Sequence, residues 1–107
     1  MSANQSTLYS IIIPVYRSEK ILDKTINRVL TVCDSQGYNV ELVLVNDGSP
    51  DDSWEIMRRW SQKDKRVRSV NLLRNYGQHT AVYCGIKLSK GDFLITMDDD
   101  LQNPPEE

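Results

Sequence analysis

The protein has 107 residues, enough for one domain with a hydrophobic core and too few for two. A formal net charge of −2 argues against a general nucleic-acid-binding protein, which would carry a basic surface. No apolar run approaches the roughly 20 residues of a membrane span, and the polar first seven residues do not resemble a secretory signal. Cys33 and Cys84 lack metal-ligand spacing, so we expect reduced thiols in a cytoplasmic protein.

Residues 9–15 form a nearly continuous apolar run, which predicts a first strand buried on both faces, as in a parallel sheet. Pro14 cannot donate a hydrogen bond to a neighbouring strand, so it should mark the end of this strand. We expect Ser18 to cap the following helix and Gly37 to end it. The apolar face of this helix comprises Leu22, Ile26, Val29, Leu30 and Cys33.

Residues 40–45 predict a second strand. Ser49 and Pro50 predict the start of a second helix, because serine is a common cap and proline suits the first helical position. One face of this helix carries Trp54, Met57 and Trp60.

Residues 67–72 predict a third strand, which is more polar and therefore expected near an edge of the sheet. A third helix is predicted over residues 78–90, with Gly85 permitting close packing and Gly91 stopping the helix. Residues 93–97 predict a fourth, buried strand.

The element order β-α-β-α-β-α-β with short connections predicts an α/β, Rossmann-like fold with a mainly parallel sheet. Ligands of such sheets bind beyond the C-terminal ends of the strands. Four segments are expected at that edge: residues 16–19, 47–49, 74–77 and 98–102.

Three consecutive carboxylates, Asp98, Asp99 and Asp100, follow the fourth strand. Alternate side chains of an extended or turning backbone share a side, so Asp98 and Asp100 can share Mg²⁺ or Mn²⁺ while Asp99 points elsewhere. Gln102, one alternate step further, can add a carbonyl oxygen. The alternative is an acidic loop that is solvated or that caps a following helix.

Other polar residues at this edge have both a structural and a functional interpretation. Asp47 either belongs to a tight turn or accepts hydrogen bonds from a ribose or a base. Tyr16 can pack against a base, Glu19 can accept from a sugar or a base, and Arg74 can pair with phosphate or remain solvated. The sequence has no glycine-rich dinucleotide fingerprint and no P-loop, so it lacks the usual phosphate cradles.

Five stretches, in order across nearly the whole chain, resemble family 2 glycosyltransferases of the GT-A fold. They are residues 11–16, 43–49, 74–78, 91–92 and 97–106. The last, M-D-D-D-L-Q-N-P-P-E, is similar to the polyprenyl-phosphate glycosyltransferases, relatives of dolichol-phosphate mannose synthase and of bacterial undecaprenyl-phosphate sugar transferases. The other four mark the wider family.

The resemblance implies that residues 1–107 are the N-terminal, donor-binding part of a glycosyltransferase domain. The expected nucleotide-binding residues are Pro14, Tyr16, Glu19, Asp47, Arg74, Asp98 and Asp99. Asp98 and Asp100 match the D-x-D of the family and are implied as catalytic residues and metal ligands, with Gln102 as a further ligand. Two positions depart from the family: Arg17 and Ser18 precede Glu19, and Asn46 replaces the first acid of the common Asp-Asp-Gly-Ser.

The implied reaction transfers a sugar from a UDP- or GDP-linked donor with inversion, and a metal ion stabilises the diphosphate as it leaves. A lipid-phosphate acceptor is already anionic, whereas a glycan hydroxyl acceptor needs a general base. We expect acceptor-binding elements and any membrane helices beyond Glu107, with the parent protein at the cytoplasmic face of a membrane. The 107-residue chain alone is therefore expected to lack transferase activity.

Two other classes fit less well. Haloacid-dehalogenase-type phosphotransferases also place D-x-D after an apolar strand, but on an early strand and with Thr or Val where this chain has Gln102. A nucleotide-binding module without catalysis is a second alternative, above all for the isolated chain. A calcium-binding loop does not fit, because Asn103 stands where such loops require glycine.

Overall fold

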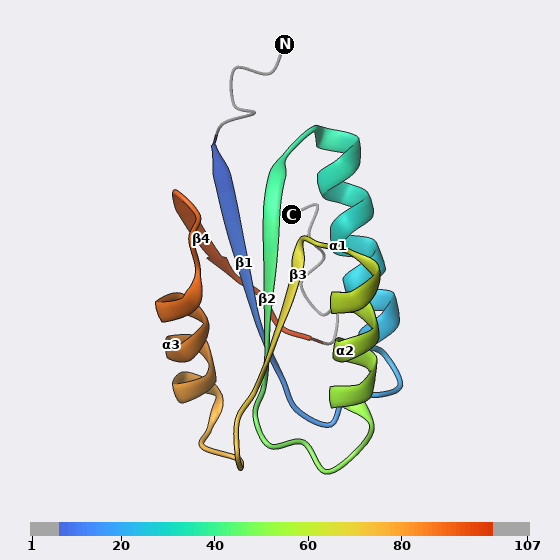
Figure 1. Ribbon diagram of the computed structural model, residues 1–107, viewed down its shortest axis with the longest axis vertical. Helices are drawn as coiled ribbons and strands as arrows, with labels where there is room; N and C mark the ends of the chain where they lie inside the picture. Colours follow the sequence, from blue (N-terminus) through green and yellow to red (C-terminus); the bar gives the residue numbers. More distant parts are fainter. Residues whose placement is uncertain (1–6, 100–107) are drawn as a thin grey trace.

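The computed structural model describes residues 7–99, in which strands and helices alternate (Figure 1). In chain order the elements are β1 (Leu8–Val15), α1 (Leu22–Gln36), β2 (Asn39–Asn46), α2 (Ser53–Lys63), β3 (Val67–Asn71), α3 (Gln78–Leu88) and β4 (Phe93–Thr96). This order confirms the predicted α/β pattern. In the described part of the chain, no helix has the length and apolar character needed to cross a membrane.

The four strands form one parallel sheet in the order β3-β2-β1-β4. Helices α1 and α2 cover one face and α3 covers the other, so each connection between parallel strands crosses over the sheet (Figure 1). The polar strand β3 lies at an edge, as its composition predicted. All the strands point the same way, so their C-terminal ends lie along one edge of the sheet.

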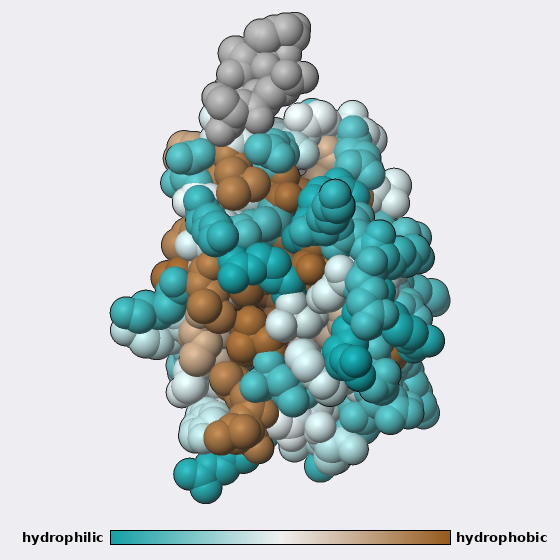
Figure 2. Space-filling view, in the orientation of Figure 1, coloured by the Kyte–Doolittle hydropathy of each residue, from teal (hydrophilic) through white to brown (hydrophobic). Residues whose placement is uncertain are grey.

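The core lies on both faces of the central strands, because successive side chains of a strand point to opposite sides. Ile11, Ile13 and Val15 pack on the side of α1 and α2, whereas Ile12 packs with Ala81 of α3 on the other side. Figure 2 shows hydrophilic residues over α1 and α2 and an apolar strip on the side of α3. The face that carries a single helix is therefore the less completely covered one.

Gly85 brings α3 against the sheet, because a Cβ at this position would lie only 2.5 Å from Cγ2 of Ile12. This confirms the close packing expected of Gly85. The prediction that Gly91 stops the helix is wrong, since α3 ends at Leu88. Gly91 instead donates its amide hydrogen to Oγ of Ser10 at 2.8 Å, and a side chain there would collide with Ser10.

Two predicted helix caps are also wrong. Helix α1 begins at Leu22 and helix α2 at Ser53, and neither has a side-chain cap. The hydroxyl of Ser49 donates to Asp51 Oδ1 at 2.5 Å and accepts from the amide of Arg17 at 2.8 Å. The hydroxyl of Ser18 likewise bonds to other loop atoms. These serines connect loops to one another, which the sequence pattern of a cap does not distinguish.

The fourth strand was predicted to be buried, and the structure corrects this. Phe93, Leu94 and Ile95 are 58%, 45% and 44% exposed. Strand β4 lies at the edge of the sheet beside β1, and α3 packs on β1 and β2 rather than over it. Within residues 7–99, no further strand pairs with the outer edge of β4.

Candidate functional site

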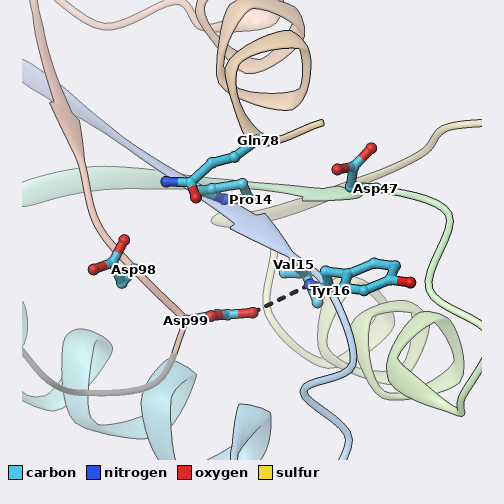
Figure 3. Close-up of a pocket in the computed structure, with 7 residues that line it drawn as sticks. All are labelled: Pro14, Val15, Tyr16, Asp47, Gln78, Asp98 and Asp99. Carbon is cyan, nitrogen blue, oxygen red and sulfur yellow. Dashed lines mark hydrogen bonds between the residues drawn. The ribbon is translucent and has the colours of Figure 1, made fainter. Parts of the chain in front are cut away.

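Two adjoining hollows lie at the C-terminal ends of β1, β2 and β4, where α3 begins, and Figure 3 shows the first of them. Their volumes are about 220 and 260 Å³, and they share Pro14, Gln78 and Asp98. The first is also lined by Val15, Tyr16, Asp47 and Asp99. The second is also lined by Val82, Thr96 and Met97. This is the edge at which parallel α/β sheets bind ligands.

Asp47 is held rigidly at the end of β2. Its side chain is buried, and Oδ1 accepts a hydrogen bond of 2.8 Å from the amide of Tyr76. The amide of Gly77 donates to Oδ2 at 3.1 Å, and the amide of Asp47 itself donates to the carbonyl of Val15 at 2.9 Å. The carboxylate therefore joins the ends of β1 and β2 to the start of α3.

Asp98 and Asp99 follow β4 on the other side of the first hollow. The amide of Met97 donates a hydrogen bond to the carbonyl of Ile12 at 3.0 Å, which attaches this segment to β1. Asp98 lines both hollows, whereas Oδ2 of Asp99 accepts from the amide of Tyr16 at 3.2 Å (Figure 3). The other two predicted metal ligands, Asp100 and Gln102, lie outside the described residues.

The loop that carries Tyr16 is tied to its neighbours through every amide from residue 16 to residue 19. These four amides donate, in order, to the side chains of Asp99, Ser49, Ser53 and Asp51. Tyr16 is 38% exposed, and the guanidinium of Arg17 lies 5.3 Å from the centre of its ring. Hydrogen bonds with the side chains of Arg17 and Asn75 lower the pKa of the Tyr16 hydroxyl.

Asp51 stabilises this arrangement from the loop after β2. Burial alone would raise the pKa of its carboxyl group, but hydrogen bonds from Ser49, Ser53 and the amide of Glu19 lower it from 3.8 to about 2. The carboxylate is therefore ionised at neutral pH and holds the loops after β1 and β2 together.

The structure brings together five of the expected nucleotide-binding residues at the first hollow: Pro14, Tyr16, Asp47, Asp98 and Asp99. Glu19 lies elsewhere, where Oε1 accepts from the amide of Asp52 at 3.1 Å beside a separate hollow. Arg74 is exposed, with its guanidinium 5.3 Å from the centre of the Tyr76 ring.

Several residues at the site were not predicted from the sequence. Gln78 lines both hollows, and its position directly after Gly77 at the start of a helix was the available signal. Ser18, Ser49 and Ser53 hold the loop of Tyr16. Serines near a helix start have the same pattern whether they cap the helix or bridge two loops, so no local signal separates these roles.

The chemistry of the described side chains fits a hard divalent cation only in part. Asp47, Asp98 and Asp99 supply oxygen ligands and a concentration of negative charge at one hollow. Within residues 7–99, however, no three side chains of His, Cys, Asp or Glu lie close enough to hold one ion. Mg²⁺ is commonly held by one or two carboxylates together with substrate phosphates, and Asp98 is a carboxylate that lines both hollows.

These features define a parallel α/β domain with an acidic site at the edge where such sheets bind ligands, and comparison with known proteins places it in a family. The model of glycosyl transferase family 2 matches residues 10–107, so the chain belongs to this family. The undecaprenyl-phosphate 4-deoxy-4-formamido-L-arabinose transferase of Edwardsiella ictaluri is 50% identical over 99 residues. That match covers 92% of this chain and 30% of the relative, so the chain spans about a third of its length.

Solved structures agree with the fold. TarS 1-349 of S. aureus, in complex with UDP-GlcNAc, superposes with a TM-score of 0.76 at 27% identity, over 88% of this chain and 27% of that one. The mannosyltransferase PcManGT of Pyrobaculum calidifontis, in complex with GDP-Man and Mn²⁺, gives 0.75 at 20% identity, over 86% of this chain and 27% of that one. The expected GT-A fold is thereby confirmed.

Proposed function

We propose that the protein to which this chain belongs transfers a sugar from a nucleotide-diphosphate donor to undecaprenyl phosphate, and that residues 7–99 bind the donor. The observation that carries the proposal is the convergence of Tyr16, Asp47 and Asp98, from three different strand ends, on one hollow. This is the edge where the fold binds ligands, and family membership supplies the reaction class.

Each of these residues has a role suited to its setting. The partly exposed ring of Tyr16 packs against the base, and the fixed carboxylate of Asp47 accepts hydrogen bonds from the base or the ribose. Asp98 and Asp100, with Gln102 and the diphosphate oxygens, hold Mg²⁺ or Mn²⁺. When bound, the ion stabilises the negative charge that develops on the departing diphosphate. Arg74 and Glu19 lie outside this hollow and are assigned to the periphery of the nucleotide.

The acceptor is proposed from the names of related proteins, because the residues that line the hollow do not identify it. The relative at 50% identity is named for transfer to undecaprenyl phosphate, and its sugar, 4-deoxy-4-formamido-L-arabinose, is the first to test. A phosphate acceptor is ionised at neutral pH, so the chain's own residues need only orient the donor and exclude water, without a strong general base. Because this acceptor is a lipid, the whole protein would work at a membrane surface, which we place at its cytoplasmic face.

The proposal is tested by incubating the whole protein with UDP- and GDP-linked sugars, undecaprenyl phosphate and Mn²⁺, and by measuring sugar–lipid formation. We expect a product whose formation requires the metal and falls by a factor of about 10² or more in Asp98→Ala and Asp100→Ala. An acceptor carrying a free hydroxyl in place of the phosphate is the control. Transfer to the hydroxyl acceptor alone would contradict the lipid-phosphate assignment, and transfer that is insensitive to both substitutions would contradict the site.

A further inference from the structure

The middle carboxylate of the acidic triplet is already engaged by protein atoms. Oδ2 of Asp99 accepts hydrogen bonds from the amide of Tyr16, at 3.2 Å, and from the hydroxyl of Ser18. Its main-chain carbonyl accepts from Oγ1 of Thr25 at 2.9 Å. Asp99 is thus bound through its side chain to the loop between β1 and α1, and through its backbone to Thr25 in α1.

The groups that hold Asp99 belong to a rigid part of the molecule. Ser18 is 3% exposed and Thr25 is fully buried. The amides of Arg17 and Ser18 donate to Ser49 and Ser53 at 2.8 and 3.0 Å, so this loop is itself fixed to the loop after β2. Ser18 and the amide of Tyr16 therefore provide a fixed attachment for Asp99.

Asp98 stands near the end of a short edge strand, and the amide of the preceding Met97 joins this segment to the carbonyl of Ile12 in β1. Asp98 follows β4, a strand of four residues that lies at the edge of the sheet with exposed side chains on both faces. Short edge strands are the parts of a sheet that open most readily. The ties of Asp99 come directly after Asp98 in the chain and limit how far that carboxylate can move.

We propose that Asp99 is a positioning residue that holds the Asp98 carboxylate in the nucleotide hollow by attaching the end of β4 to Tyr16 and Ser18. The inference rests on the proposed donor site, since it assigns Asp98 to the diphosphate and its metal. Asp99 was expected to contact the nucleotide directly. The inference instead gives it a role that depends on accepting hydrogen bonds and not on its charge. The two side-chain hydrogen bonds end on one oxygen, and the carbonyl oxygen of an asparagine can accept both.

The test compares Asp99→Asn, Asp99→Ala and Ser18→Ala with the wild-type protein in two measurements. One is the exchange rate of the Tyr16 amide hydrogen, followed by NMR without nucleotide or metal. The other is the affinity for UDP and GDP in the presence of Mn²⁺. Asp92→Ala is the matched control, because Oδ2 of Asp92 also accepts a main-chain amide, that of Leu8 at 2.8 Å, but at the opposite end of β4.

We expect Asp99→Asn to retain slow exchange and near wild-type affinity. Asp99→Ala should exchange the Tyr16 amide faster and bind nucleotide about tenfold more weakly, as expected for the loss of one or two hydrogen bonds. Ser18→Ala, which alters a buried residue away from the ligand, should give a smaller loss in the same direction. Asp92→Ala should leave both the Tyr16 amide and the affinity unchanged.

Equal weakening in Asp99→Asn and Asp99→Ala would overturn the proposal, because it would mean that the charge of Asp99 contacts ligand or metal. Unchanged affinity in Asp99→Ala would overturn it as well. If Asp99→Ala does not fold, Asp99→Asn and Ser18→Ala still decide between the two roles. If the proposed donor site is wrong, the wild-type protein will bind no nucleotide. The exchange measurement still applies in that case: slow exchange of the Tyr16 amide in Asp99→Ala would contradict the attachment of β4 to Tyr16.

Discussion

The carboxylate of Asp47 accepts a hydrogen bond of 2.8 Å from the backbone amide of Tyr76, which joins the end of β2 to the loop before α3. The same carboxylate accepts from Gly77, and the side chain is buried. One residue thus fixes the two residues that lead into α3 and presents an acidic group to the hollow.

Asp47→Ala should therefore affect stability and binding together. Leaving the amides of Tyr76 and Gly77 without their acceptor is expected to lower the free energy of unfolding by about 1–3 kcal/mol. Urea denaturation measures this change, and titration with UDP or GDP measures the accompanying loss of affinity. Asp52→Ala, an exposed residue of the neighbouring turn, should change neither quantity. Equal effects of the two substitutions would contradict the role given to Asp47.

Gly48 and Gly37 have similar backbone conformations, but only Gly48 lies against another loop. Both have positive φ angles, 66° and 74°. A Cβ on Gly48 would collide with the backbone of Arg74 and Asn75, whereas a Cβ on Gly37 would meet nothing within 4 Å.

Gly37→Ala is therefore expected to cost only the strain of the left-handed conformation, about 1 kcal/mol. Gly48→Ala should cost at least about 3 kcal/mol, because the loop before α3 must also move. Denaturant unfolding of both variants checks this difference. If the two costs were similar, the close contact between the loops after β2 and β3 would be in error.

The folded and unfolded pKa values of Asp51 predict a specific acid sensitivity. Hydrogen bonds lower its pKa in the folded protein to about 2, against an ordinary 3.8. A depressed carboxyl pKa contributes stability that is fully present above the unfolded value and is lost as the pH falls toward the folded one.

The wild-type protein should accordingly be more stable than Asp51→Asn at pH 5.5, and this difference should shrink between about pH 4 and pH 2. Other carboxylates with lowered pKa values, such as Glu41 and Asp64, affect both proteins equally. Unfolding free energies of the pair across this pH range provide the measurement. A difference that is constant down to pH 2 would rule out the assigned ionisation.

The alternation of strands and helices was predictable from the sequence, because buried strands appear as apolar runs and buried helix faces as apolar residues three or four positions apart. The face of α1 from Leu22 to Cys33 was predicted and is buried. The exposure of β4 was not predictable, because Phe93, Leu94 and Ile95 are as apolar as the residues of β1. Whether an apolar strand lies at the centre or at an edge depends on which strand pairs with it, and sequence composition does not encode that directly.

The residues of the candidate site were also predictable in part. Residues at the C-terminal ends of parallel strands must lie along one edge, so the convergence of Tyr16, Asp47 and Asp98 followed from the order of elements. The partners of Ser18 and Asp99 did not follow, since they lie 81 residues apart in the chain. Side-chain hydrogen bonds between distant loops leave no periodic signal in the sequence.

A pair of isoleucine substitutions tests the exposed position of β4. Ile13 is fully buried in β1, whereas Ile95 is 44% exposed in β4. Ile13→Ala should lower the free energy of unfolding by about 2–5 kcal/mol, and Ile95→Ala by about 1 kcal/mol. Chemical denaturation of the two variants provides the comparison. A loss at Ile95 as large as that at Ile13 would mean that β4 is part of the core after all.

The central claim, a metal-assisted nucleotide site at the ends of β1, β2 and β4, is tested most directly by calorimetric titration with UDP and GDP. The titration is carried out with Mn²⁺ and with a chelator, on the wild-type protein and on Asp98→Ala. One of the two nucleotides should bind at least about tenfold more tightly with Mn²⁺, and Asp98→Ala should remove that gain. Binding of equal strength with and without the metal, or a gain that survives in Asp98→Ala, would contradict the account.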